Sequence, residues 1–305
     1  MEFFLVLFVN GLTLGSVYAL IALGYSMVYG ILKLLNFAHG DIYMMGAFAG
    51  YGVLITFGGP KAPTIPVVLL VIFMFVVAMV FAGVLGVAIE RFAYRPLRRA
   101  PRIAPLISAI GVSFFLESVA LLLFGAQFRS YNTPSMIDVR TGIQIGPVHV
   151  SLVRIIVIVS AVVLMVALQL LVNRTRLGRA MRATSFDMEA AAMMGVDVDR
   201  VVVATFLIGS ALAGAAGVMM GLVYNRVFHF MGFVAGLKGF TAAVIGGIGS
   251  IPGAMLGGLL IGMAESFTAG YISSTFQNLI VFGLLIIFLL VRPVGFFGRS
   301  EIVKV

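Results

Sequence analysis

Long apolar runs separated by short polar stretches dominate the 305-residue chain. A membrane span needs about 20 apolar residues, because the hydrocarbon layer is about 30 Å thick and an α-helix rises about 1.5 Å per residue. The runs are continuously apolar rather than alternating, which excludes a transmembrane β-barrel. The pattern therefore predicts an all-α, polytopic membrane helix bundle of eight or nine spans, near residues 4–29, 39–57, 66–89, 103–124, 151–172, 201–224, 234–250, 253–271 and 276–291.

Two of these segments, 39–57 and 234–250, are short and rich in glycine. We expect that either of them is a broken or re-entrant helix rather than a plain span. Irregular backbone is tolerated at membrane depth where it is buried in protein or lines a cavity.

The composition supports a membrane protein and narrows its chemistry. Hydrophobic residues make up 62% of the chain and charged residues 10%, a balance that no soluble domain of this length has. The net charge of +9 is explained by basic residues in cytoplasmic loops, so we expect no nucleic-acid partner. The chain has no cysteine, which excludes disulfides and thiolate metal sites, and we predict no metal site.

Basic residues predict the orientation of the bundle. Because positively charged loops remain in the cytoplasm, we expect three basic regions there, namely Arg91, Arg95, Arg98, Arg99 and Arg102, then Arg174, Arg176, Arg179 and Arg182, and in the C-terminal tail Arg292, Arg299 and Lys304. The connections near 58–65 and 125–150 have few basic residues and are expected to face outward. This alternation closes for nine crossings, with the N-terminus outside and the C-terminus in the cytoplasm.

The stretch ATSFDMEAAAMMGVDVDRV, residues 183–201, concentrates charge between two apolar runs. Thr184 followed by Asp187 is typical of a helix start, and Gly195 of a helix end. The next membrane helix is then capped by one of two aspartates, Asp197 or Asp199. We expect a short cytoplasmic helix whose Met-rich face inserts into a groove of another protein. The alternative is a solvated loop that only reverses the chain.

A second polar cluster stands at the start of a short apolar segment, in NFAHGDIYMMGAF. Asn36, His39 and Asp41 gather there beside Gly40. A helix that begins at this point directs its positive end at whatever precedes it, which is how transporters hold a carboxylate at the membrane midplane. The alternative is structural, with Asp41 as an N-cap and His39 bonding a neighbouring helix. Both roles are compatible.

The stretch LKGFTAAVIGGIGSIPGAMLGG contains Gly246, Gly247 and Gly249, which permit an irregular turn at membrane depth. We expect this break and the one near 30–50 to be equivalent elements of two internal halves that meet at a central pathway. Ordinary packing of small residues between helices is the alternative.

Two acidic residues, Glu117 and Glu265, lie inside apolar runs. A carboxylate at the bilayer centre costs roughly 3 kcal/mol, so each is expected to face the bundle interior and to have a partner. That partner is either the ammonium group of a zwitterionic substrate or another helix. For Lys238, pairing with an acid or snorkelling is expected rather than substrate contact.

The chain lacks the motifs of common enzymes. It has no G-x-x-x-x-G-K-[ST], H-E-x-x-H or G-x-S-x-G pattern, and its histidines, His39, His149 and His229, are scattered. Any ATP must therefore be bound by a partner, and we expect this chain to have no enzymatic activity and to bind no cofactor itself.

Five stretches carry a family resemblance. The order Glu189-Ala190-Ala191-x-x-x-Gly195 resembles the coupling loop of ABC importer permeases, although the downstream Ile-x-Leu-Pro is absent. Four further stretches, and their order, resemble branched-chain amino acid permeases of the LivH type over nearly the whole chain, namely NGLTLGSVYALIALGYSMVYGILKLLNFAHGDIYMMGAFAGY, ERFAYRPLRRAPRIAPLISAIGVSFFLE, GRAMRATSFDMEAAAMMGVDVDRV and GLKGFTAAVIGGIGSIPGAMLGGLLIGMAES. The resemblance implies one permease domain over residues 1–305, with a cytoplasmic coupling loop at 183–199.

The resemblance also implies the other subunits of the transporter. Such a permease pairs with a homologous second permease, two cytoplasmic ABC ATPases and a periplasmic solute-binding protein in the bacterial inner membrane. The coupling residues, which would sit in the ATPase groove, are Asp187, Glu189, Ala190, Ala191 and Gly195. The family imports leucine, isoleucine and valine, and relatives carry other amino acids or small solutes. The alternative from another transport class is an ion-gradient-driven secondary amino acid carrier.

Overall fold

The computed structural model describes residues 2–58, 65–98, 100–101, 103–131, 133–137, 141–146 and 148–298. In this part of the chain, eight helical segments are long and apolar enough to cross a membrane, which confirms the expected helix bundle: Glu2–Leu32, His39–Phe57, Val67–Leu97, Ile103–Phe124, Leu152–Arg174, Val198–Tyr224, Ile251–Tyr271 and Ser274–Val291. A ninth, shorter apolar helix covers Met231–Gly246. Four basic residues used for the orientation lie outside the described residues, namely Arg99, Arg102, Arg299 and Lys304. Part of the connection near 58–65 does so too.

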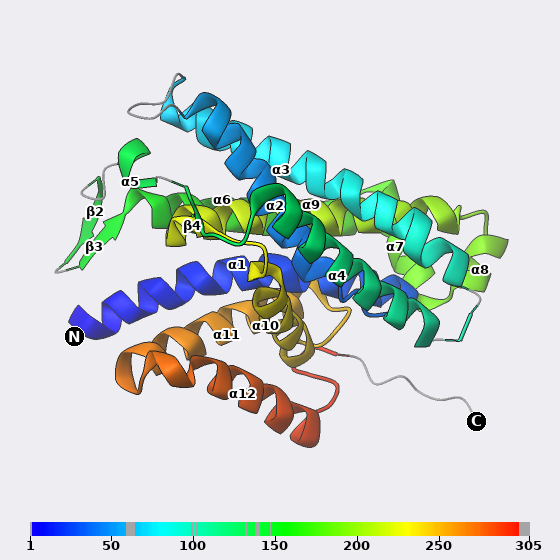
Figure 1. Ribbon diagram of the computed structural model, residues 1–305. Coiled ribbons are helices and arrows are strands. Elements are labelled where there is room, and N and C mark those ends of the chain that lie inside the picture. Colours follow the sequence, from blue (N-terminus) through cyan, green and yellow to red (C-terminus); the bar gives the residue numbers. More distant parts are fainter. Residues whose placement is uncertain are drawn as a thin grey trace.

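The helices form one bundle whose two ends differ (Figure 1). The membrane helices are α1 (Glu2–Leu32), α2 (His39–Phe57), α3 (Val67–Ile89), α4 (Ile103–Phe124), α6 (Leu152–Arg174), α9 (Val198–Tyr224), α10 (Met231–Gly246), α11 (Ile251–Tyr271) and α12 (Gln277–Val291). At one end lie α7 (Arg176–Phe186) and α8 (Met188–Met193), together with the extension of α3. The two described basic connections therefore share one end, as the positive-inside rule predicts.

At the opposite end the chain forms short strands and turns (Figure 1). The strand β1 (Arg129–Ser130) pairs with β4 (Arg226–Val227), and β2 (Gly142–Ile145) forms a hairpin with β3 (Val148–Ser151), beside α5 (Thr133–Met136). The sequence predicted only the side that this connection faces, so the hairpin is a feature that the structure adds. Tyr131 anchors this region, because its buried hydroxyl donates to the carbonyl of Ala47 in α2 at 2.5 Å.

Close packing of glycine holds the centre of the bundle together. A Cβ atom added to Gly258 in α11 would lie 2.3 Å from the Cα of Ala19, and one added to Gly262 would lie 2.1 Å from the backbone nitrogen of Gly15. The backbones of α1 and α11 therefore touch, as in small-residue membrane interfaces. The outer helices α3, α4, α6 and α12 are largely exposed and apolar, which suits lipid contact.

The helices α2 and α10 both begin in the interior of the bundle and run in opposite directions (Figure 1). Their N-terminal ends meet, since a Cβ atom on Gly40 would lie 2.4 Å from the carbonyl oxygen of Gly232. Each helix is reached by a non-helical connection, residues 33–38 before α2 and 225–230 before α10. The breaks expected in the glycine-rich segments 39–57 and 234–250 therefore lie at the starts of α2 and α10.

Candidate functional site

The polar stretch forms two short helices at one end of the bundle. Helix α7 precedes α8, and Asp187 is the N-cap of α8, because its Oδ1 accepts hydrogen bonds from the backbone N–H groups of Glu189 and Ala190 at 2.9 Å. Thr184 does not start this helix, contrary to the prediction. It lies inside α7, where its buried hydroxyl donates to the carbonyl of Ala180 at 2.9 Å, an interior arrangement open to threonine.

The end of α8 follows the prediction. Gly195 has a φ of +83°, a left-handed conformation that glycine adopts without strain. The N–H of Val196 then bonds to the carbonyl of Ala191 at 3.0 Å. Asp197, rather than Asp199, caps α9 by accepting from the N–H of Arg200 at 3.1 Å.

The ends of α7 and α8 present apolar side chains away from the rest of the chain. Phe186, Met193 and Met194 are 93%, 81% and 85% exposed. A loop that only reversed the chain would not require large apolar side chains to be exposed to this extent. Of the five coupling residues, Asp187, Glu189, Ala190 and Gly195 are exposed and Ala191 is buried. Three large apolar side chains are therefore exposed within nine residues of the chain.

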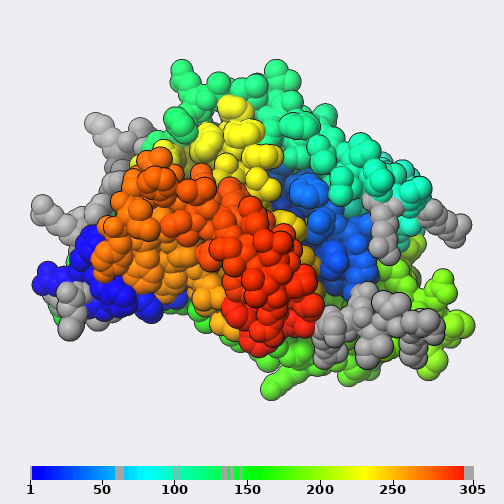
Figure 2. All heavy atoms as spheres, turned by 90° about the horizontal axis from the view of Figure 1, so that it is seen from below, coloured from blue at the N-terminus to red at the C-terminus, as the bar shows by residue number. Residues whose placement is uncertain are grey.

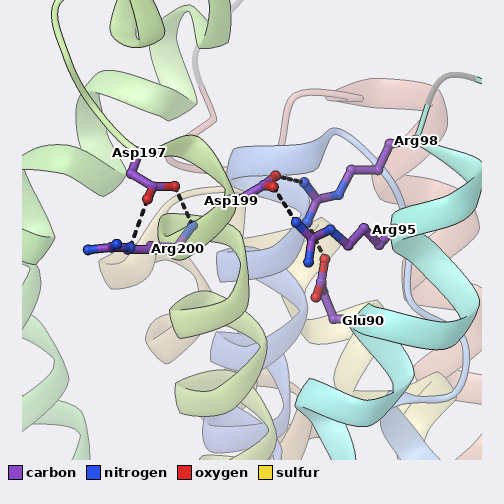
Figure 3. Close-up of polar contacts among 6 residues, drawn as sticks. All are labelled: Glu90, Arg95, Arg98, Asp197, Asp199 and Arg200. Atoms are coloured by element: carbon purple, nitrogen blue, oxygen red, sulfur yellow. Dashed lines mark hydrogen bonds and ion pairs between the residues drawn. The ribbon is translucent and has the colours of Figure 1, made fainter.

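An ion-pair cluster ties the start of α9 to the extension of α3 (Figure 3). Asp199 pairs with Arg95 at 2.6 Å and with Arg98 at 2.5 Å. Arg98 also pairs with Glu90, whose side chain is fully buried. No local pattern predicted this cluster, although Asp199, which is not needed to cap α9, and the nearby arginines could have indicated it.

The extension of α3 begins as a π-helix, Glu90–Tyr94, followed by a 3₁₀ turn, Arg95–Leu97. Such π-helical turns often occur at functional sites. Here the turn places the Tyr94 hydroxyl on the connection before α2, where it donates to the carbonyl of Leu35 at 3.1 Å and to Oδ1 of Asn36 at 3.2 Å.

The structure brings Asn36, Gly40, Asp41 and Glu117 to the start of α2. Asp41 is not the N-cap, because Ala38 holds that position without a side-chain hydrogen bond. Asp41 instead lies in the first turn, where its Oδ2 accepts from the hydroxyl of Ser113 in α4. Glu117 lies one helical turn after Ser113 on the same face of α4.

His39 points towards α1 rather than into this cluster. Its ring packs edge-on against Tyr25 with centroids 4.8 Å apart. A Cβ atom on Gly24 would lie 2.1 Å from its Nε2, so the absence of a side chain there makes room for the imidazole. His39 therefore contacts α1 through its ring, and its Nε2 atom has no hydrogen-bond partner among the described residues.

Glu265 is satisfied within the protein. Its Oε1 accepts from the ammonium of Lys238 at 2.7 Å and its Oε2 from the hydroxyl of Tyr18 at 2.8 Å. All three side chains are buried. The expected interior partner for this acid, and the expected acid partner for Lys238, are confirmed.

Gly246 ends α10, and Gly247 and Gly249 lie in the turn between α10 and α11. Gly247 and Gly249 have φ values of +105° and +89°. The turn packs on the segment after α12, where the N–H of Phe297 bonds to the carbonyl of Gly246 at 3.0 Å. Gly249 also lines a small cavity with residues that include Ser26, Gly30, Arg182 and Ser185. Neither Asp41 nor Glu117 is among the nearest neighbours of these glycines. The turn therefore lies apart from the acids at the start of α2.

Comparison with known proteins gives a consistent result. Residues 7–290 match the family described as "Branched-chain amino acid transport system / permease component". The chain is 43% identical to the high-affinity branched-chain amino acid transport system permease protein BraD of Pseudomonas aeruginosa, over 97% of this chain and 96% of the relative. It is 42% identical to the corresponding protein LivH of Escherichia coli K12, over 99% of this chain and 98% of the relative. The fructose import permease protein FrcC of Rhizobium meliloti is 34% identical over 35% of this chain and 31% of the relative. No solved structure matches the chain significantly.

Proposed function

The chain belongs to the family of branched-chain amino acid transport permeases, and from this membership we propose that it forms the membrane pathway for leucine, isoleucine and valine, or for a related small solute. The observation that carries the proposal is the identity of 42–43% over almost the full length of two such permeases. The eight long apolar helices support a multi-pass protein of the inner membrane. Membership of this family decides against an ion-gradient-driven carrier.

The proposed assembly contains a homologous second permease, two ABC ATPases that hold ATP and Mg²⁺, and a periplasmic binding protein that delivers the solute. The chain itself has no phosphate-binding G-x-x-x-x-G-K-[ST] motif, so the proposed energy source is the separate ATPase. The basic connections near 91–98 and 174–182 lie at one end of the bundle, which we assign to the cytoplasm. The alternation of nine helices then puts the C-terminus in the cytoplasm.

Helix α8 is the proposed contact with the ATPase. The surface formed by Phe186, Met193 and Met194 is apolar and flexible in shape, which suits a groove on a partner. Glu189 and Gly195 lie exposed on the same loop. A rigid N-cap at one end and a glycine turn at the other fix the orientation of this surface.

The proposed pathway passes the point where α2 and α10 begin. Two helix N-terminal ends that meet inside a membrane bundle supply free N–H groups and positive dipole ends, a feature that transporters use at solute sites. Asn36, Gly40, Asp41 and Glu117 lie at this point. Gly246, Gly247 and Gly249 are assigned a position at the cytoplasmic exit, beside the cavity at Ser26 and Arg182. Glu265 supports the helices behind the pathway, and His39 the start of α2.

The energy source tests this proposal. Cells or vesicles that contain the chain with its partners are expected to lose uptake when ATP is depleted and to retain it in the presence of an uncoupler. The chain is also expected to co-purify with an ABC ATPase. Uptake that survives ATP depletion and stops with an uncoupler would support the secondary carrier instead.

A further inference from the structure

One side of α4 differs from the other exposed faces of the bundle, because the acidic residue Glu117 lies at its edge. The exposed faces of α3, α6 and α12 are apolar except at the helix ends, as lipid contact requires. On α4, the buried stripe is Pro105, Ala109, Ser113, Leu116, Glu117 and Ala120. Glu117 lies at the edge of this stripe, on the same side as the partly exposed Ile110 and Leu121.

Asp41 and Glu117 lie together beneath this face. The hydroxyl of Ser113 joins α4 to Oδ2 of Asp41, and Glu117 follows Ser113 by four residues on α4. The two carboxyl groups are near enough to act on each other electrostatically. His229, in the connection before α10, also lies near Glu117, and its electrostatic effect there is opposite in sign.

Both acids have an oxygen atom that the protein leaves without a partner. Asp41 is 1% exposed and Glu117 is 8% exposed, yet Oδ1 of Asp41 and Oε1 of Glu117 have no hydrogen bond in the described part of the chain. The Oδ1 atom of Asp41 faces the start of α10, where a Cβ atom on Gly232 would lie 2.8 Å away. Glu265, in contrast, has a lysine and a tyrosine on its two oxygens.

Buried carboxyl groups at membrane depth require a cationic or hydrogen-bonding partner. Two unpartnered carboxyl oxygens on facing helices suit a compact donor with several N–H groups. An ammonium group has three such donors. A zwitterionic amino acid carries one. A metal ion is not expected here, because the described residues include no group of three or more His, Cys, Asp or Glu that could hold it.

We propose that Asp41 and Glu117, joined by Ser113, receive the ammonium group of the amino acid as it passes through the membrane. The α4 face beside Glu117 then borders the pathway, and the opposite face of α4, which includes the 64% exposed Phe115, contacts lipid. Figure 2 shows α4 on one side of a hollow and α12 on the other. The proposal rests on the proposed function, because it assumes an amino acid substrate.

The native chain has no cysteine, so a single introduced thiol reports local access. S113C, in the assembled transporter in proteoliposomes under ATP turnover, is treated with two water-soluble methanethiosulfonates of similar size. One carries an ammonium group and the other a sulfonate. The ammonium reagent is expected to react roughly tenfold faster or more, because the two acids concentrate cations. Addition of Asp41→Asn and Glu117→Gln is expected to abolish this preference.

Two controls keep the result interpretable. F115C, on the lipid-facing side of α4, is expected to react with neither reagent until the protein is denatured. I110C supplies a second thiol on the Glu117 side, should S113C fail to assemble. An equal rate for both reagents, a preference that survives removal of both acids, or no reaction during turnover would overturn the proposal. Failure of the proposed function would appear separately, as uptake that does not depend on ATP.

Discussion

Arg98 holds Asp199 at 2.5 Å across 101 positions of sequence, and so fastens the start of α9 to the extension of α3 (Figure 3). The start of α9 directly follows the α8 loop that is proposed to contact the ATPase. The extension of α3 in turn carries Tyr94, whose hydroxyl contacts Asn36 just before α2. A short series of direct contacts therefore connects the α8 loop, which is proposed to bind the ATPase, with the start of α2, where the proposed pathway passes.

The first prediction concerns this link. Asp199→Asn removes one partner of a pair that is about half exposed, so the free energy of unfolding is expected to fall by no more than about 1 kcal/mol. Uptake is expected to fall by about 5–150-fold, the range of typical coupling free energies, while ATP hydrolysis by the assembled complex continues. The measurement is uptake and ATPase activity in the same proteoliposomes. Arg200→Ala, which leaves Asp199 paired, is the matched control and is expected to retain both activities.

The second prediction concerns the α8 surface. Glu189→Lys or Gly195→Trp is expected to abolish uptake while the protein stays in the membrane, because both changes alter an exposed surface rather than the core. Gly195→Asn serves as the control, since asparagine tolerates the φ of +83°. Uptake and co-purification of the ATPase are measured together. Normal uptake by both altered proteins would remove the docking role.

The third prediction concerns the buried pair Lys238 and Glu265. Lys238→Met leaves the Glu265 carboxylate without its cationic partner, so the free energy of unfolding is expected to fall by about 3–5 kcal/mol. Joint replacement by Lys238→Met and Glu265→Leu is expected to restore much of the loss, because no buried charge remains. Thermal unfolding in detergent measures both. A single variant as stable as the original would show that the pair contributes little.

The fourth prediction concerns the contact between α1 and α11. Gly262→Leu is expected to prevent accumulation of folded protein, because even a Cβ atom would lie 2.1 Å from the backbone nitrogen of Gly15. Gly283→Ala in α12 is the control, since no atom of the described residues lies within 4 Å of its added Cβ atom. The amount of monodisperse protein extracted from membranes distinguishes the two. Equal yields would contradict the tight contact.

The membrane helices could be predicted because each is encoded by a local run of apolar residues. The end of α8 at Gly195 could also be predicted from a local signal, because glycine favours the left-handed conformation that ends a helix. Thr184 shows the limit of local signals, because whether a threonine caps a helix or lies inside one depends on where the preceding helix began. Thr175 caps α7 earlier in the chain by accepting from the N–H of Gly178.

Contacts between residues far apart in the sequence could not be predicted from local patterns. The ion pairs of Asp199 and the bond from Ser113 to Asp41 join helices whose mutual position no local pattern defines. The glycines at 246–249 illustrate the same difficulty, because glycine permits a turn at any depth. The structure places the break of that segment at the start of α10, and the glycines at its end.

The close approach of Gly40 and Gly232 has an electrical consequence. A net charge that crosses the membrane at this point requires about 2.3 kcal/mol of electrical work per 100 mV. The proposed amino acid substrate carries charges that sum to zero and requires almost none. In the proposed assembly the membrane voltage therefore neither drives nor opposes its movement.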